Sequence, residues 1–263
     1  MGSNKGLILD IDDTLYSVND YLPNALKCAV KAMIEAGLPA KSSDEALGKL
    51  IEIRKPDSNA LNHFNLLCMS YGISPDNQRI IQAGRTAYHN TKFSLIQKRE
   101  GLVELLDYAT EGGYKLGIVS NGREDKQWEK LVRLDLLRYF SLKGKDSRII
   151  DDYVFISDEE GIKKPSPKLF EQAIEKMDLD PKQTISVGDR LEDVLAAHRA
   201  DIGTAVRLLM GKYKNETPVS YMTKQGYSFE QLRVPNAEIN KMLKELAPDL
   251  SIGGFNELLP RLK

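Results

Sequence analysis

The chain has 263 residues, which is enough for one large domain or two smaller ones. Its 37 basic and 38 acidic residues give a net charge of −1, so the charge balance indicates neither a nucleic acid nor a membrane surface as partner. Apolar runs stay below the roughly 20 residues of a membrane span, and no signal peptide precedes the first predicted strand. We therefore expect a cytoplasmic protein, in which Cys28 and Cys68 are reduced core cysteines.

Short apolar runs alternate with amphipathic segments along much of the chain, which is typical of a parallel α/β sheet. The predicted strands are Gly6–Asp10, Lys115–Ser120, Tyr153–Ile156, Thr184–Gly188 and Thr204–Leu208. The predicted crossover helices are Gly101–Gly112, Arg123–Tyr139, Pro167–Met177 and Leu191–Ala200. The fold class that this order predicts is α/β, with a Rossmann-like parallel sheet flanked by helices.

About a hundred residues separate the first two strands, far more than a crossover needs. This stretch has apolar residues at helical spacing in four segments: Asn19–Ala36, Ser43–Arg54, Ser58–Tyr71 and Pro75–Phe93. We therefore predict an α-helical cap over residues 16–96, inserted into a catalytic core made of residues 1–15 and 97–263. An insertion after the first strand of a parallel sheet lies near the carboxyl ends of the strands, where ligands bind, so the cap is expected to act as a lid.

Two further segments have no clear periodicity. Ser141–Asp152 is predicted to be a polar, solvated loop. Gly211–Pro248 is long and polar, with one helix expected over Pro235–Leu246.

Polar residues follow several of the predicted strands and converge at one edge of the sheet. They are Asp10 and Asp12 after the first strand, Ser120-Asn121-Gly122 after the second, Asp189 and Asp193 after the fourth, and Lys163-Lys164 before Pro165. Residues i and i+2 of a strand face one side, so Asp10 and Asp12 are expected to crowd each other. At ~4 Å and an effective dielectric of about 20 their repulsion is on the order of 4 kcal/mol, which calls for a cation, a shared proton or a strand end that separates them.

The chemistry of this set suits a phosphate group. Three or four carboxylates without histidine or cysteine form an all-oxygen site, which favours a hard cation such as Mg²⁺. The hydroxyl and backbone N–H groups of Ser120–Gly122 suit anion oxygens, and a lysine adds positive charge. One aspartate can then attack phosphorus while a second protonates the leaving oxygen and later deprotonates water.

The set Asp10-Ile11-Asp12-Asp13-Thr14, Ser120-Asn121-Gly122, Lys164-Pro165 and Gly188-Asp189…Asp193 resembles the four motifs of the haloacid dehalogenase-like hydrolase superfamily, in order. The resemblance covers nearly the whole chain, with the helical insert matching the small cap of that family. It implies that Asp10 is the nucleophile and a metal ligand, and that Asp12 is the general acid/base with its backbone carbonyl on the metal. It implies further that Ser120, Asn121 and Lys164 bind phosphate, with Lys163 as the alternative to Lys164. Asp189 is implied to bind Mg²⁺, and Asp193 either to bind the metal or to support its ligands. Tyr16 lies just past Thr14, where the chain leaves the first strand, and for this residue a place in the site and a place outside it are both open.

Asp12 separates the activities within the superfamily, because an alkoxide leaving from phosphorus needs a proton and a halide does not. Three stretches also resemble an archaeal subgroup of small phosphosugar phosphatases that includes glyceraldehyde 3-phosphate phosphatase: Ala32–Leu38, Ala87–His89 and Lys126–Leu131. We therefore predict a Mg²⁺-dependent phosphatase, monomeric or homodimeric, that hydrolyses a small phosphorylated metabolite such as a phosphosugar or triose phosphate through an aspartyl-phosphate. The alternatives are a phosphomutase and a non-catalytic phospho-acceptor or binding member of the fold.

Overall fold

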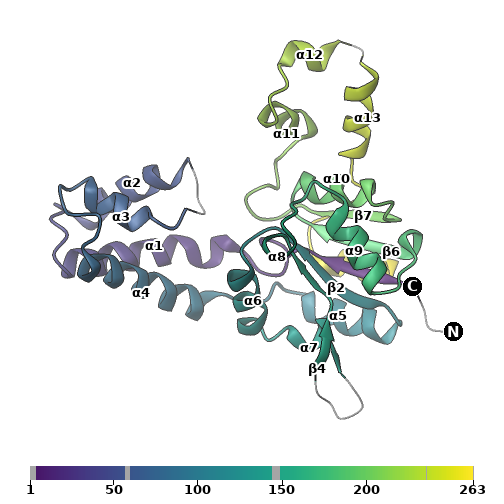
Figure 1. Cartoon of the computed structure of the whole chain (residues 1–263), viewed down its shortest axis with the longest axis horizontal. Helices are drawn as coiled ribbons and strands as arrows, with labels where there is room; N and C mark the ends of the chain where they lie inside the picture. Colours follow the sequence, from purple (N-terminus) through teal and green to yellow (C-terminus); the bar gives the residue numbers. More distant parts are fainter. Residues whose placement is uncertain (1–3, 57–59, 144–148, 235, 263) are drawn as a thin grey trace. The chain divides into compact units, whose positions relative to one another are not determined.

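The computed structural model describes residues 4–56, 60–143, 149–234 and 236–262. The chain divides into two compact units (Figure 1). The first, called the α/β unit below, comprises residues 1–17 and 97–263; the second, the helical unit, comprises residues 18–96. No helix among the described residues is both long and apolar enough to cross a membrane.

A six-stranded parallel sheet forms the centre of the α/β unit, in the order β5-β2-β1-β6-β7-β8. Its strands are β1 (Gly6–Leu9), β2 (Lys115–Ser120), β5 (Val154–Ile156), β6 (Thr184–Gly188), β7 (Thr204–Leu208) and β8 (Leu250–Ile252). The central strand β1 is buried throughout and pairs with β2 and β6, so its carboxyl end lies between theirs. The parallel α/β prediction is confirmed, with the five predicted strands in place.

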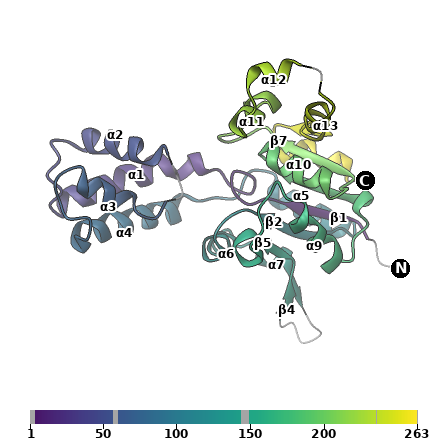
Figure 2. The ribbon, with the colours of Figure 1, turned by 45° about the horizontal axis from the view of Figure 1, so that its top comes forward.

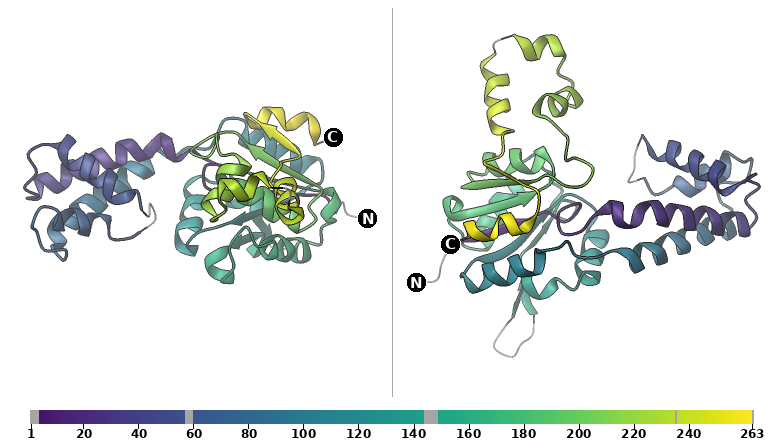
Figure 3. Two further views of the ribbon diagram at one scale, coloured as in Figure 1. Left: turned by 90° about the horizontal axis from the view of Figure 1, so that it is seen from above. Right: turned by 180° about the vertical axis from the view of Figure 1, so that it is seen from behind.

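Helices cover both faces of this sheet. Helices α9 (Lys168–Lys176) and α10 (Leu191–Arg199) pack on one face through a core that includes Ile8, Val119 and Phe155. Helix α5 (Leu102–Glu111) contacts β2 from the other face (Figures 1 and 3). The predicted helix over 123–139 is instead two helices, α6 (Glu124–Arg133) and α7 (Leu137–Phe140), because Asp135 between them has a φ of +47° that a helix cannot contain.

The segment 141–152 was expected to be a loop, and this is wrong for its described ends. Strands β3 (Ser141–Lys143) and β4 (Ile149–Asp152) pair in antiparallel fashion there, and Ser157–Glu160 forms the short helix α8 after β5. Residues 144–148 of that segment lie outside the described residues.

The segment 211–248 contains more structure than the one predicted helix. That helix is present as α13 (Ala237–Glu245), while its predicted first residue, Pro235, lies outside the described residues. Two further helices are present, α11 (Pro218–Lys224) and α12 (Phe229–Arg233). Each begins with a capping box, which is a helix-start signal in the sequence that the prediction did not include. All three pack beside α10 in one apolar cluster, and Figure 2 shows them together.

The helical unit consists of α1 (Val18–Glu35), α2 (Ser43–Arg54), α3 (His63–Met69) and α4 (Gln78–Leu95). Helices α1 and α4 lie side by side, and the core between the four helices includes Met33, Leu50 and Ile81 (Figure 3). The predicted start of the third helix near Ser58 lies outside the described residues. Cys68 is a buried free thiol as expected, but Cys28 is exposed on α1, so its assignment to the core was wrong.

Candidate active site

Asp10 lies at the carboxyl end of the central strand. Its backbone N–H donates to the carbonyl of Val187 at 2.9 Å, which extends the pairing of β1 with β6 by one residue. Asp10 Oδ1 then accepts hydrogen bonds from Ser120 Oγ at 2.9 Å and from Lys164 Nζ at 2.8 Å. Burial raises the pKa of Asp10 to about 6, although the Lys164 ammonium partly offsets this effect.

Lys164 is the cation of this cluster. Its ammonium contacts Asp193 Oδ1 at 2.5 Å as well as Asp10, and it also donates to the carbonyl of Val119 at 2.9 Å. Burial on its own lowers the pKa of the Lys164 ammonium, but the two carboxylates outweigh burial and hold it above its usual value. Lys163 is exposed, so the structure brings Lys164 to the site in preference to its neighbour.

Asp10, Asp189 and Asp193 form a compact set of buried carboxylates, in which one oxygen from each lies within 4.8 Å of the others. Both oxygens of Asp189 are buried and have no hydrogen-bond partner among the described residues. Burial, reinforced by the charges of Asp193 and Asp10, raises the pKa of Asp189 to about 9. An all-carboxylate set with an unpartnered member fits a divalent cation with oxygen ligands, such as Mg²⁺.

Asp193 reaches this set from the first turn of α10. Its Oδ2 accepts a hydrogen bond from the backbone N–H of Arg190 at 3.0 Å, which caps the helix. A Cβ at Gly188 would lie 2.5 Å from Asp193 Cγ, so only glycine at the end of β6 allows this carboxylate to approach the strand. The four-residue spacing of Asp189 and Asp193 thus brings both carboxylates into the same cluster.

The Asp12 carboxylate has hydrogen-bond partners that differ from those of Asp10. Strand β1 ends at Leu9, and the chain then turns, with Asp13 at a φ of +56°. The Asp12 carboxylate accepts two hydrogen bonds from Lys130 Nζ, at 2.7 and 2.8 Å, and one from the Tyr16 hydroxyl. The turn therefore separates the two carboxylates and gives each its own lysine.

The environment of Asp12 favours its ionised form. Partial burial on its own raises the pKa of Asp12, but the Lys130 ammonium and the hydrogen bonds from Lys130, Tyr16 and Gln127 hold it below its usual value. Gln127 Nε2 donates to Asp12 Oδ2 at 3.0 Å. The side chain of Asp12 is absent from the carboxylate set found among the described residues, and the contact of its backbone carbonyl with metal stays a prediction.

Gln127 and Lys130 were not predicted as site residues. They lie three residues apart on α6, so both face the same way, and both are buried. That spacing was the available signal, but a lysine and a glutamine on a charged helix are usually solvated. The Tyr16 hydroxyl donates to Asp12, so Tyr16 contacts the site.

Asn121 lies beside the site, but its side chain is engaged with the main chain. Its Oδ1 accepts from the backbone N–H of Lys164 at 2.8 Å, and its Nδ2 donates to the carbonyl of Lys164 at 3.1 Å. Asn121 therefore fixes the segment that carries the site lysine, and its direct contact with phosphate stays a prediction.

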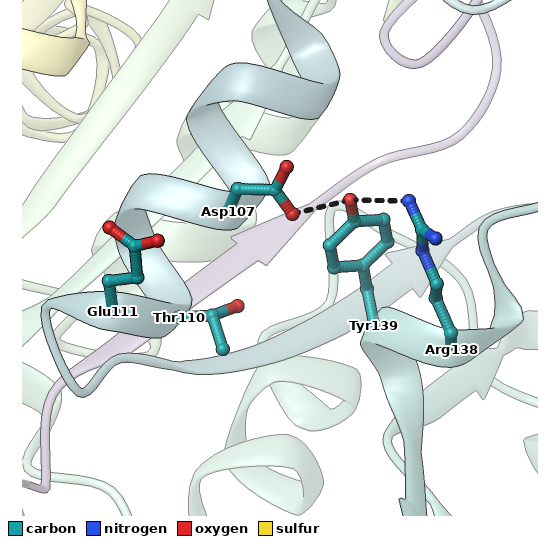
Figure 4. Close-up of a pocket in the computed structure, with 5 residues that line it drawn as sticks. All are labelled: Asp107, Thr110, Glu111, Arg138 and Tyr139. Atoms are coloured by element: carbon teal, nitrogen blue, oxygen red, sulfur yellow. Dashed lines mark hydrogen bonds between the residues drawn. The ribbon is translucent and has the colours of Figure 1, made fainter.

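A surface pocket of the α/β unit lies elsewhere, between α5 and α7 (Figure 4). It is lined by Asp107, Thr110, Glu111, Arg138 and Tyr139. The Tyr139 hydroxyl donates to Asp107 at 2.6 Å and accepts from Arg138 at 3.1 Å, so these groups satisfy one another. The unpartnered carboxylate at the strand ends is the stronger indication of chemistry.

Known proteins resemble this chain over most of its length. Glyceraldehyde 3-phosphate phosphatase of Methanopyrus kandleri is 34% identical to this chain over 248 residues, which cover 93% of the chain and 99% of the relative. The protein of that name from Methanocaldococcus jannaschii is 34% identical over 243 residues, or 92% of this chain and 99% of the relative.

Solved structures share the fold at low sequence identity. The HAD-hydrolase YfnB of Bacillus subtilis, bound to magnesium, has a TM-score of 0.60 at 18% identity and full coverage of both chains. A HAD phosphatase from Thermococcus onnurineus has a TM-score of 0.58 at 21% identity and covers 98% of this chain and 97% of its own. The model of the family described as haloacid dehalogenase-like hydrolase matches residues 7–206, which confirms the resemblance of the four motifs. The chain therefore belongs to the haloacid dehalogenase-like hydrolases.

Proposed function

We propose that this protein is a Mg²⁺-dependent phosphatase that hydrolyses a small phosphomonoester through a phosphorylated Asp10. The observation that carries the proposal is the surrounding of Asp10, whose Oδ1 is held by the Ser120 hydroxyl and the Lys164 ammonium beside the unpartnered Asp189. This arrangement combines a fixed carboxylate nucleophile with donors for phosphate oxygens.

The proposed reaction has two half-reactions, formation of the aspartyl-phosphate and its hydrolysis, and each site residue has a role in one or both. Asp10 attacks phosphorus to form an aspartyl-phosphate, while Ser120 and Lys164 stabilise the negative charge of the phosphate oxygens. Asp12 is ionised in the resting protein, so it first takes up a proton from solvent or from the monoanionic phosphate group and passes it to the leaving oxygen. The ionised Asp12 then removes a proton from the water that hydrolyses the aspartyl-phosphate. Asp10, Asp189 and Asp193 would hold Mg²⁺, which neutralises charge as the anionic groups approach each other.

The substrate class that we propose is a triose phosphate or a related phosphosugar. Support comes from the relatives named glyceraldehyde 3-phosphate phosphatase, which match this chain over nearly its whole length. We propose further that the helical unit, residues 18–96, is the cap that selects the leaving group and excludes water.

The test is release of inorganic phosphate from a panel of phosphometabolites that includes glyceraldehyde 3-phosphate, with Mg²⁺ and with EDTA. Asp10→Asn is expected to abolish release, whereas Asp135→Asn, an exposed turn aspartate, serves as the matched control and keeps it. Conversion of a sugar phosphate to its isomer without release of phosphate would refute hydrolysis and identify a phosphomutase.

A further inference from the structure

We propose that Lys130, acting together with Gln127, positions the Asp12 carboxylate for proton transfer to the leaving group. This inference rests on the proposed phosphatase function and extends it to a second lysine, on α6. Lys130 is a positioning residue, because it acts through Asp12 and not on the reacting atoms.

The Lys130 ammonium contacts both carboxylate oxygens of Asp12. Nζ of Lys130 lies 2.7 Å from Asp12 Oδ1 and 2.8 Å from Oδ2, so the ammonium fixes the carboxylate from both oxygens. The Lys130 side chain is 11% exposed, whereas that of Asp12 is 40% exposed. The cation is thus enclosed by the protein, and the carboxylate that it holds keeps an open side.

Gln127 makes this arrangement rigid. Its Oε1 accepts from Lys130 Nζ at 2.7 Å, and its Nε2 lies 3.0 Å from Asp12 Oδ2 and 2.8 Å from the carbonyl of Asn121. A Cβ at Gly122 would collide with the Gln127 amide, so glycine at this position, with a φ of +151°, lets α6 approach the loop after β2.

The same glutamine links the acid/base to the nucleophile. Gln127 Nε2 lies 3.3 Å from Ser120 Oγ, which in turn donates to Asp10. Asp12 and Asp10 are therefore held by one connected network. Because proton transfer depends on the position of the donor relative to the leaving oxygen, loosening Asp12 should slow the step that needs a proton and spare a step that does not.

Two substrates separate these outcomes. Glyceraldehyde 3-phosphate loses an alkoxide, which needs a proton, whereas p-nitrophenyl phosphate loses a stable phenolate, which does not. Lys130→Met should lower kcat/KM for the alkyl ester by roughly 10- to 100-fold, within the range of general acid catalysis, and this loss should exceed that for the aryl ester at least tenfold. kcat/KM is the informative constant, because it reports steps only as far as departure of the leaving group.

Two controls isolate the role of Lys130. Lys126→Met removes a more exposed lysine of the same helix and should leave both constants near those of the parent protein. In an Asp12→Asn background, Lys130→Met should add almost no further loss, because its partner is gone. Tyr16→Phe removes one donor to Asp12 and should give a smaller loss of the same selectivity, so the test survives poor folding of Lys130→Met.

The outcomes also separate this inference from the proposed function. If the parent protein releases phosphate from both esters but Lys130→Met and Tyr16→Phe lower the two constants equally, then Lys130 is a structural residue and the inference is wrong. An additive loss in the Asp12→Asn background would overturn it as well. If the parent protein releases phosphate from neither ester nor from any member of the phosphometabolite panel, the proposed function itself fails.

Discussion

Binding of Mg²⁺ is expected to release a proton from Asp189. Both oxygens of this carboxylate are buried without partners among the described residues, and burial raises its pKa to about 9. At pH 7 the metal-free protein therefore holds Asp189 protonated, whereas a metal ligand must be ionised. Raising the pH from 7 to 8 should strengthen the apparent affinity by about tenfold, which corresponds to about 1.4 kcal/mol.

Isothermal titration calorimetry with Mg²⁺ measures this proton directly. Titrations at pH 7 in two buffers that differ in ionisation enthalpy should show about one proton released per ion bound. Asp135→Asn is the matched control, because it removes an exposed aspartate at a turn with positive φ, which asparagine tolerates. A dissociation constant that stays the same from pH 7 to pH 8, with no proton released, would refute the reasoning.

The same group makes the metal-free protein less stable as the pH rises. The folded state keeps a proton on Asp189 that the unfolded chain, with a pKa of 3.8, has already lost, so stability falls between pH of about 4 and about 9. From pH 6 to pH 8 its share of the loss in unfolding free energy is about 3 kcal/mol. Urea unfolding with EDTA should show this slope, and Asp189→Asn should flatten it; equal slopes in the two proteins would contradict the buried, protonated state.

Three further substitutions test the packing and the charges. Lys164→Met leaves buried carboxylates without their cation and should destabilise the metal-free protein by about 3–5 kcal/mol in urea unfolding. Gly188→Ala places a Cβ 2.5 Å from Asp193 Cγ, so calorimetry should show weaker Mg²⁺ binding with little change in circular dichroism. Leu50→Ala in the helical unit should cost about 2–5 kcal/mol in stability, whereas its exposed neighbour Ile51→Ala should cost far less.

The fold could be predicted where burial is continuous along a strand. Every residue of β1 is buried, and an unbroken apolar run is the pattern that such a strand produces. Strand β8 has only three residues, and one of them, Ser251, is polar and exposed, so no apolar run marks it. It exists because Leu250 and Ile252 pair with β7, which places β8 at the edge of the sheet, and this pairing is a tertiary effect.

The site could be predicted where its residues follow strand ends. The ends of parallel strands meet at one edge, so the order of the chain was enough to bring Asp10, Ser120 and Asp189 together. Lys130 lies within a helix, and its burial depends on how α6 packs against the turn after β1. The pair Asp12–Lys130 is separated by 118 residues, and no local pattern reports a contact of that range.

Lys164 and Lys130 differ in the number of carboxylates that each contacts. This difference explains why the pKa of Asp10 is raised and that of Asp12 is lowered. Lys164 is shared between Asp10 and Asp193, and burial wins at Asp10, whose pKa rises to about 6. Lys130 has one carboxylate partner among the described residues, and at Asp12 the ammonium outweighs partial burial, so the pKa falls. In the proposed reaction, a cation held by the three buried carboxylates would free the Lys164 ammonium for a phosphate oxygen, while Lys130 stays with Asp12. The turn after β1 thus keeps the phosphate chemistry and the proton chemistry on separate cations, although the two aspartates are only two residues apart.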